Sequence, residues 1–324
     1  MCIGSGGLRV TEREASVVTD PPRFLVVTPC RDEEDHLEAM ISTMVAQTVR
    51  PTVWMIVDDG SSDRTPEILA EASSRHDFIR VHRREDRGRR KVGPGVIEAF
   101  YAGVEAAGGL DSFEYVCKLD ADLELPPRYF ELVIEEMRRE PLLGNYSGKV
   151  QIRLPDGTLI DERTGDENAN GQAKFYRVAC FKEIGGFVRE VGWDGIDGHM
   201  CRLHGWMARS EDRPELRMVH RRLMGSSEVG IWTGRKRWGW GKYFMGSSPV
   251  YVLAVSVYRM FERPFVIGGL GILYGYVKSW VMRKPRIDDK AFIRHLRRYE
   301  MESLLHGKRR TMQKYHDRIR SGAA

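Results

Sequence analysis

Cysteine is scarce in this chain of 324 residues, and long apolar runs are missing. The cysteines are odd in number, lie far apart and form no Cys-x-x-Cys pair: Cys2, Cys30, Cys117, Cys180 and Cys201. This pattern argues against a disulfide framework and a thiolate zinc site, and it is typical of proteins of the reducing cytosol. Residues 1–22 contain no apolar core of the kind that a secretory signal needs, and we expect a flexible tail there.

Two common classes of nucleotide-binding loop are absent as well. Neither a Walker loop nor a strand-linked Gly-x-Gly-x-x-Gly occurs, because the glycine-rich stretch Gly4–Arg9 has no preceding strand. The sequence therefore excludes the usual P-loop and dinucleotide-binding proteins. No motif favours a serine–histidine or cysteine–histidine nucleophile.

Charge is abundant but unevenly distributed. Charged residues make up 30% of the chain and hydrophobic residues 42%, as in a globular protein, and the net charge is +5. Residues 283–324 hold 13 Lys and Arg against 5 Asp and Glu, a net +8, so the remainder sums to −3. This basic end indicates an anionic surface as partner, although a solvated basic helix is the alternative. No nucleic-acid recognition module accompanies it, so we expect lipid headgroups and no nucleic acid.

Short β-branched runs alternate with helical segments in the first half of the chain. Four runs have the pattern of buried strands: Phe24–Thr28, Val53–Val57, Phe78–His82 and Tyr115–Leu119. Helical segments follow them at about 33–47, 65–76, 96–107 and 127–139. The alternation predicts an α/β fold, a mainly parallel sheet with helices on both faces. Ligands of such sheets bind outside the carboxyl ends of the strands, so the residues after each strand are the first candidates for a site.

The second half of the chain is less regular. A hairpin is predicted around Leu154–Ile160, and we expect this half to complete a single domain over 23–247. Beyond it, Pro249–Tyr258 and Pro264–Val277 are apolar but shorter than the roughly 20 residues of a membrane-spanning helix. Aromatic and basic residues flank both segments, so we expect residues 248–324 to form apolar helices and a basic C-terminal helix at a membrane interface. A helical pair packed on the domain is the alternative.

Acidic residues follow two of the predicted strands. Asp58 and Asp59 come after the second strand, and Asp120 and Asp122 come after the fourth. Two carboxylates separated by one residue at a strand end suit Mg²⁺ or Mn²⁺, which take oxygen ligands and bridge a diphosphate. Turn residues that cap the next helix would give the same pattern.

The order of five motifs carries more information than any one of them. They are TPCRDEE (28–34), VDDGSSDRT (57–65), LDADL (119–123), FKEIGGF (181–187) and GWDGID (192–197). This series resembles the family 2 glycosyltransferases, which use nucleotide-sugars and have a GT-A fold. The resemblance covers about residues 23–220. The stretch 174–206 and the segment LRMVHRR (216–222) are most similar to bacterial members of cell-surface polysaccharide assembly.

The resemblance assigns the nucleotide base to the ends of the first two strands. It implies that Thr28 and Pro29 line the base. Asp59 would accept a hydrogen bond from the base N3–H, and Asp58 would be structural. A turn carboxylate without a ligand is the alternative for Asp59.

The same resemblance implies further contacts around the donor. Arg31 and Glu33 would border the nucleotide pocket, or are surface charges at a helix start. In the basic cluster 87–91, Lys91 is the residue predicted to lie over the diphosphate, with a solvated loop as the alternative.

A cation site is implied at the Asp-x-Asp triplet. Asp120 would contact the ribose or a metal-bound water, and Asp122 would bind Mn²⁺ or Mg²⁺ directly. His220, at the end of a predicted strand, would be a third metal ligand or a structural histidine. A divalent cation stabilises the negative charge of a departing nucleoside diphosphate as a Lewis acid.

An inverting transfer also needs a general base for the proton of the acceptor hydroxyl. Family members commonly carry Glu-Asp eleven residues before a Gly-aromatic pair, and Asp194 lies eleven residues before Gly205. Trp193 replaces the Glu. We expect Asp194 to be the base, with Asp197, one helical turn away, as its rival. A helix N-cap is the alternative role for either residue.

The sequence therefore predicts an inverting glycosyltransferase that uses a nucleoside-diphosphate sugar. Its acceptor would be a glycan or lipid-linked carrier in cell-surface polysaccharide synthesis, at the inner, cytoplasmic face of the membrane. Gly234 stands where processive members carry the Gln of Gln-x-x-Arg-Trp, which favours transfer of one sugar per encounter. The alternatives are a nucleotidyltransferase and a non-catalytic sugar-nucleotide-binding or membrane scaffold.

Overall fold

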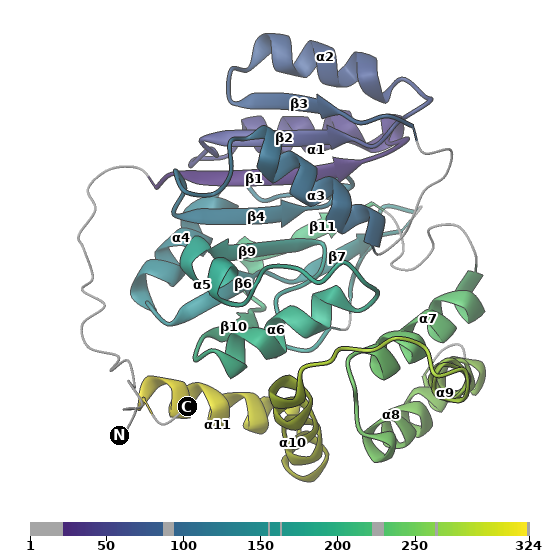
Figure 1. The fold of residues 1–324 in the computed structure, drawn as a ribbon. Helices are drawn as coiled ribbons and strands as arrows, with labels where there is room; N and C mark the ends of the chain where they lie inside the picture. The colour runs from purple at the N-terminus through teal and green to yellow at the C-terminus, as the bar shows by residue number, and fades with distance from the viewer. Residues whose placement is uncertain are drawn as a thin grey trace, which may run out of the picture.

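The computed structural model describes residues 22–86, 94–154, 156–162, 164–221, 230–262 and 265–322. Its centre is a seven-stranded sheet in the order β10-β6-β9-β4-β1-β2-β3 (Figure 1). Strands β1 to β4 are parallel, β10 is parallel to β6, and β9 runs antiparallel to β4 and β6. The strands are β1 (Phe24–Cys30), β2 (Val53–Asp58), β3 (Ile79–Arg83), β4 (Tyr115–Leu119), β6 (Leu143–Ser147), β9 (Ala173–Arg177) and β10 (Met207–Ser210).

Six helices cover the two faces of this sheet. They are α1 (Glu34–Val45), α2 (Thr65–Arg75), α3 (Pro94–Ala106), α4 (Tyr129–Arg139), α5 (Val178–Glu183) and α6 (Trp193–Leu203). Successive side chains of a strand point to opposite faces. Accordingly Phe24 and Val26 pack with α1, α2 and α4, whereas Leu25 and Val27 pack with α3, α5 and α6. Burial on both faces explains why β1 is a continuous apolar run.

The strand–helix alternation predicted from the sequence is confirmed. The predicted strand Tyr115–Leu119 has the bounds of β4, and the other three predicted strands agree with β1, β2 and β3 within two residues. The irregular second half contributes β6, β9 and β10 to the same sheet. The antiparallel strand β9, which separates β4 from β6, was not predicted.

A second, four-stranded sheet lies in the order β5-β11-β7-β8. Its strands are β5 (Leu123–Glu124), β11 (Met218–His220), β7 (Val150–Arg153) and β8 (Leu159–Asp161). Strands β7 and β8 form the predicted hairpin, and a 3-10 turn (Pro214–Leu216) precedes β11. Because β11 pairs with β5, His220 is brought beside Leu123, the residue after Asp122.

The remaining helices lie below the sheet in Figure 1. They are α7 (Gly230–Phe244), α8 (Pro249–Met260), α9 (Ile267–Val281), α10 (Lys290–His306) and α11 (Lys308–Arg320). Helices α7 and α9 approach so closely that a Cβ on Gly275 would lie 2.1 Å from the main-chain oxygen of Lys236. Glycine is therefore required at this contact.

Helix α10 joins these helices to the main domain. Phe292 and Leu296 of α10 are fully buried against Ile196 of α6 and Met245. Ile319 of α11 belongs to the core beneath the sheet. In the described part of the chain, we find no helix with the length and apolar character needed to cross a bilayer.

Candidate active site

Several strands that carry predicted site residues end at one edge of the main sheet. The carboxyl ends of β1, β2 and β4 meet there because these strands are parallel neighbours. The segment before β9 reaches the same edge, since Ala173 at the start of β9 pairs with Leu119 at the end of β4. Strands β2 and β4 flank β1, so their ends are about 10 Å apart.

Two arginines contact Asp59, the residue predicted to recognise the base. Arg84 Nη1 donates a hydrogen bond of 2.9 Å to Asp59 Oδ1. Arg31 donates to the main-chain oxygen of Asp59 at 3.0 Å and to Asp86 Oδ1 at 2.8 Å. The loops after β1, β2 and β3 are thereby held together, and Asp59 is buried.

Two residues near Asp59, Asp58 and Thr28, form hydrogen bonds within the protein that stabilise the fold. Asp58 Oδ1 accepts a hydrogen bond from the Ser61 main chain at 2.8 Å, as expected for a turn carboxylate. The Thr28 hydroxyl points into the core, where it accepts a hydrogen bond of 3.0 Å from Trp54 Nε1. Pro29 is half-buried.

Two further residues, Glu33 and Lys91, were predicted to lie near the donor, and the structure describes only Glu33. Glu33 is buried, and its main-chain N–H donates to Thr65 Oγ1 at 2.9 Å. Lys91 lies outside the described residues. Their predicted contacts with the donor stay predictions.

Asp122 and His220 are in direct contact. Asp122 Oδ2 lies 3.1 Å from His220 Nε2, and both side chains are buried. Burial lowers the pKa of His220, but the hydrogen bond and charge of Asp122, aided by Asp120 and Glu162, raise it above the ordinary value. Burial raises the pKa of Glu162, whose carboxylate accepts a hydrogen bond from Gln172 at 3.0 Å.

This pair offers one oxygen and one nitrogen ligand to a cation. Among the residues that the structure describes, no three His, Cys, Asp or Glu side chains converge on one point. Mg²⁺ and Mn²⁺ sites in nucleotide enzymes commonly take few protein ligands and several phosphate or water oxygens. His220 Nδ1 is buried with no hydrogen-bond partner among the described residues, and Nε2 faces the Asp122 carboxylate. Asp122 and His220 therefore fit a divalent cation shared with a diphosphate.

Asp120 is held by a lysine beneath it. Lys118 Nζ donates to Asp120 Oδ1 and to the main-chain oxygen of Gly171 at 2.9 Å. The main-chain N–H of Asp120 donates to the Gln172 oxygen at 2.8 Å. Asp120 is thus fixed against the segment that precedes β9.

The two candidate bases have opposite environments. Asp194 is exposed in the first turn of α6, and a Cβ placed on Gly171 would lie 3.2 Å from its Oδ2. Asp197 is 1% exposed and accepts hydrogen bonds from Lys174 Nζ at 2.5 Å and from the Tyr176 hydroxyl. Burial raises the pKa of Asp197, and Lys174 and Tyr176 partly offset this effect. Of the two carboxylates, that of Asp194 is open to an acceptor.

The sequence did not point to the lysines at this edge. Lys118 and Lys174 lie inside strands β4 and β9, and both are buried. A lysine within a strand ordinarily indicates a solvent-facing position. The signal that was available is the position of Lys118, two residues before Asp120 in an otherwise apolar run.

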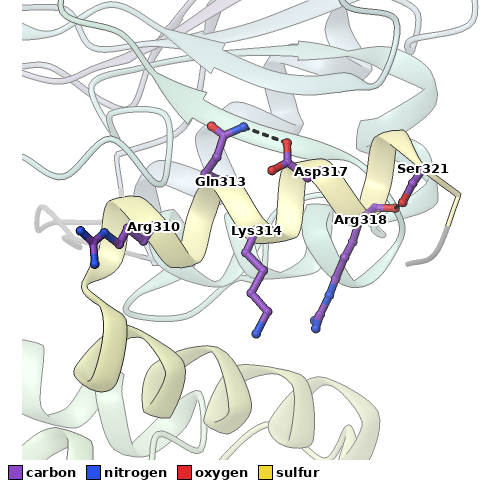
Figure 2. A pocket seen from close by; sticks show the side chains of 6 residues that line it. All are labelled: Arg310, Gln313, Lys314, Asp317, Arg318 and Ser321. Atoms are coloured by element: carbon purple, nitrogen blue, oxygen red, sulfur yellow. Dashed lines mark hydrogen bonds between the residues drawn. The ribbon is translucent and has the colours of Figure 1, made fainter.

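A shallow pocket on α11 lies apart from these residues. Five side chains of this helix and that of Ser321, the residue after it, line the pocket, as Figure 2 shows, and Gln313 Nε2 donates to Asp317 Oδ1 at 2.9 Å. No residue of the sheet edge reaches it. Because its groups come from one face of one helix and do not converge, the sheet edge is the better candidate for chemistry.

Comparisons with known proteins agree with the sequence-based resemblance. The sequence model of a family described as glycosyl transferase family 2 matches residues 25–210, more than half of the chain. A poly-beta-1,6-N-acetyl-D-glucosamine synthase of Staphylococcus epidermidis is 31% identical over 289 residues, which cover 82% of this chain and 66% of that protein. The synthase of Staphylococcus aureus strain MSSA476 is 32% identical over 130 residues, 40% of this chain and 29% of that protein. The matches therefore span less than two thirds of these relatives' lengths.

A solved structure shares the fold. The crystal structure of GalNAc-T7 with UDP, GalNAc and Mn²⁺ superimposes with a TM-score of 0.56 at 14% identity, covering 88% of this chain and 58% of that one. The GT-A fold expected from the sequence is confirmed.

Proposed function

The chain belongs to glycosyl transferase family 2, and from this premise we propose that it is an inverting enzyme of cell-surface polysaccharide synthesis. It would move a sugar from a nucleoside-diphosphate sugar to a hydroxyl of a glycan or lipid-linked carrier. The observation that carries the proposal is the placement of an exposed carboxylate, Asp194, at the sheet edge that also carries Asp59, Asp120 and Asp122.

We propose UDP-N-acetylglucosamine as the first donor to test. The relatives are named synthases of poly-N-acetylglucosamine, and the solved neighbour holds UDP and Mn²⁺. Pro29, Arg31, Glu33 and Asp59 would surround the base, and Asp120 would contact the ribose. Lys91, outside the described residues, would approach the diphosphate.

The chain's own residues would divide the chemistry between them. Asp122 and His220, with Asp120 beside them, would hold Mn²⁺ or Mg²⁺, which when bound stabilises the charge of the leaving diphosphate. Asp194 would accept the acceptor's hydroxyl proton as that oxygen attacks the anomeric carbon. The bond to the nucleoside diphosphate breaks on the opposite side, and its electrons leave with the diphosphate. Asp197, buried with Lys174, would not reach an acceptor and would instead position α6.

The donor half of the proposal can be tested by calorimetry and a turnover assay. UDP should bind more tightly with Mn²⁺ than without it, and UDP-N-acetylglucosamine with Mn²⁺ should release UDP. Asp122→Ala should remove both the Mn²⁺ dependence and the turnover, because it removes the cation's oxygen ligand. Asp111→Ala, on the exposed surface, is the matched control and should behave as wild type. Equal UDP affinity with and without Mn²⁺ would refute the metal role.

The same assay separates the alternative functions. A chain that binds UDP with Mn²⁺ but never transfers or hydrolyses the donor would be a non-catalytic sugar-nucleotide-binding scaffold. Release of pyrophosphate from a nucleoside triphosphate and a sugar phosphate would identify a nucleotidyltransferase. Product length with a short glycan acceptor tests the prediction that one sugar is added per encounter.

We further propose that α8 and α9 bind the inner face of an anionic membrane. Phe261, Trp280 and Val281 are 77%, 65% and 70% exposed, and eight further apolar residues within α8 and α9 are also exposed. Single exposed apolar residues are common, but a contiguous patch is typical of an interaction surface. Exposed basic residues, among them Lys278 and Arg283, border this patch and complement anionic headgroups.

Vesicle sedimentation tests the membrane proposal. The protein should pellet with phosphatidylglycerol-rich vesicles, less so at high salt. Phe261→Asp combined with Trp280→Asp should weaken binding by about 10²- to 10⁴-fold, because each buried aromatic contributes about 1.5–3 kcal/mol. Val81→Asp, a control at a singly exposed apolar residue of β3, should pellet as wild type. Unchanged pelleting of the double variant would contradict the proposal.

A further inference from the structure

Lys118 and Lys174 are buried lysines that face each other across two strands of the main sheet. They are direct partners in the antiparallel pair β4–β9, so both side chains leave the same face. Their exposures are 2% and 0%. Adjacent like charges repel, and each buried ammonium needs a carboxylate partner. Buried ion pairs can often be replaced by apolar residues without loss of stability, so stability alone does not account for this arrangement.

Each lysine holds a different part of the candidate active site. Lys118 Nζ donates to Asp120 and, at 2.9 Å, to the main-chain oxygen of Gly171. Lys174 Nζ donates to Asp197 Oδ2 at 2.5 Å and to the main-chain oxygen of Asp194 at 2.7 Å. One lysine therefore fixes the Asp-x-Asp triplet, and the other fixes the turn that carries Asp194.

The ring of Trp193 lies against both ammonium groups. Its centroid is 5.2 Å from Lys118 Nζ and 5.7 Å from Lys174 Nζ, within the range of cation–π attraction. An edge contact with Phe187, at 4.8 Å between ring centroids, holds the ring from another direction. Trp193 directly precedes Asp194, so the position of this ring fixes the position of the first turn of α6.

Gly171 connects the part held by Lys118 with the turn that carries Asp194. Lys118 binds its carbonyl oxygen, while its Cα faces the Asp194 carboxylate, since a Cβ there would lie 3.2 Å from Oδ2. A shift of Lys118 would thus move Asp120 and also Gly171, which lies beside the Asp194 carboxylate.

We propose that Lys118, Lys174 and Trp193 form one positioning unit, which sets the separation between the cation-side carboxylates and the base. The inference rests on the proposed function, because it assigns a purpose to the distance between Asp120 and Asp194. The three residues do not touch the reacting atoms. They act through the groups that they hold.

The main test removes the anchor of α6 without leaving a buried charge. In Lys174→Met/Asp197→Leu both partners become apolar, so the fold should be kept. The kcat for UDP-N-acetylglucosamine should fall by about 10²-fold, as expected for a displacement of the order of 1 Å, while the Kd of UDP with Mn²⁺ stays within about twofold. The fall should be the same across the pH range, because the variant leaves Asp194, the proposed proton acceptor, in place.

A second variant probes the other end of the unit. Lys118→Met should raise the Kd of UDP with Mn²⁺ by about tenfold, because Asp120 loses its fixed orientation. Trp193→Phe, which keeps an aromatic face, should retain more turnover than Trp193→Leu. Equal turnover in these two variants would contradict the role of the ring.

A matched control separates positioning from stability. Lys149 is also a buried lysine, bound to the Gly165 oxygen at 2.8 Å and paired with Asp166 at 2.8 Å. Asp166 is 47% exposed, so Lys149→Met/Asp166→Leu should change the melting temperature by less than the buried pair does, and it should leave kcat within twofold of wild type. If both double variants lower kcat equally, the effect is structural and the inference is wrong.

The outcomes also distinguish this inference from the proposed function. Wild-type turnover that depends on Asp194, together with an unchanged kcat in Lys174→Met/Asp197→Leu, would overturn the inference and leave the function standing. Absence of both UDP binding and turnover in wild type would overturn the function, and the inference with it.

Discussion

The carboxyl edge of the main sheet buries charged side chains, whereas the surface of α8 and α9 exposes apolar side chains. At the sheet edge, Lys118, Lys174 and Asp197 are charged yet at most 2% exposed. Trp280 of α9 and Phe261, the residue after α8, are apolar yet 65% and 77% exposed. Buried ion pairs have fixed hydrogen-bond directions, whereas an exposed apolar surface gains free energy only when something covers it. The comparison teaches that the sheet edge fixes the positions of its side chains, whereas α8 and α9 present an apolar surface for binding.

Helix α6 belongs to both regions. Its first turn carries Asp194, and Ile196, two residues later, packs on Phe292 and Leu296 of α10. The two regions can therefore be separated experimentally only by substitutions that act on one side of this helix.

The largest effect is expected at the sheet edge. Asp194→Asn should lower kcat by about 10²–10⁴-fold, because an amide does not accept the hydroxyl proton, while the affinity for UDP with Mn²⁺ stays unchanged. Turnover of UDP-N-acetylglucosamine and calorimetry measure the two quantities. Asp35→Asn, the same change at an exposed position of α1, serves as control. Undiminished turnover in Asp194→Asn would assign the base elsewhere.

The next largest effect is expected at the junction where α10 packs on α6. Phe292→Ala should lower the free energy of unfolding by about 3–5 kcal/mol, because the ring is fully buried between α10 and α6. Leu305→Ala on the same helix should change it by less than about 0.5 kcal/mol, since that side chain is 73% exposed. Urea unfolding followed by circular dichroism gives both values. Equal losses would mean that α10 is not docked on α6.

Acid should weaken the same junction. Burial, followed by the charge of Arg202, lowers the pKa of His295 to about 4. In the unfolded chain a histidine titrates near 6.5, so the unfolded state takes up the proton first as the pH falls. The stability contributed by neutral His295 is present above pH 6.5 and is lost as the pH falls towards 4.

The acid effect has a defined size and control. Between pH 7 and pH 5 the free energy of unfolding should fall by about 2 kcal/mol on account of His295. Urea unfolding at both pH values, in wild type and in His295→Phe, isolates this contribution from the buried carboxylates, whose raised pKa acts in the opposite direction. An identical pH dependence in the two proteins would contradict the prediction.

The smallest effects are expected inside the helical region. Gly275→Ala should cost about 1–3 kcal/mol, because its methyl group would collide with the Lys236 main chain on α7. Gly234→Ala on α7 should stabilise by about 0.5–1 kcal/mol, since a Cβ there meets open space in a helix. Thermal unfolding of the two variants should show shifts of opposite sign. A shift of the same sign would mean that α7 and α9 separate readily.

The sequence predicted the first half of the fold well. The strands β1, β2 and β4 are mostly apolar runs of five to seven residues, and β3 (IRVHR) alternates β-branched with basic residues; turn residues and helices follow them, so their signal is local. Strand β9 was missed because AKFYR carries two basic residues, one of which, Lys174, is fully buried through an ion pair with a residue 23 positions away. Local patterns do not reveal such pairings.

The candidate site was predictable in its residue types but not in its environments. Asp122 and His220 were singled out from motifs, and the structure places them 3.1 Å apart, although their binding of a metal stays a prediction. Asp194 and Asp197 lie one helical turn apart, and the sequence could not rank their exposure. The difference between them comes from Lys174 and Tyr176 on β9, whose position depends on the whole sheet.

The missing side chain of Gly171 has a practical consequence for engineering. A methyl group there would displace the neighbouring Asp194 carboxylate by only a few tenths of an ångström, and larger groups would displace it further. A graded series of residues at this position would therefore yield enzymes of stepwise slower transfer that keep every ionisable group of the native site. Such slow forms are suited to trapping the acceptor-bound complex for crystallography.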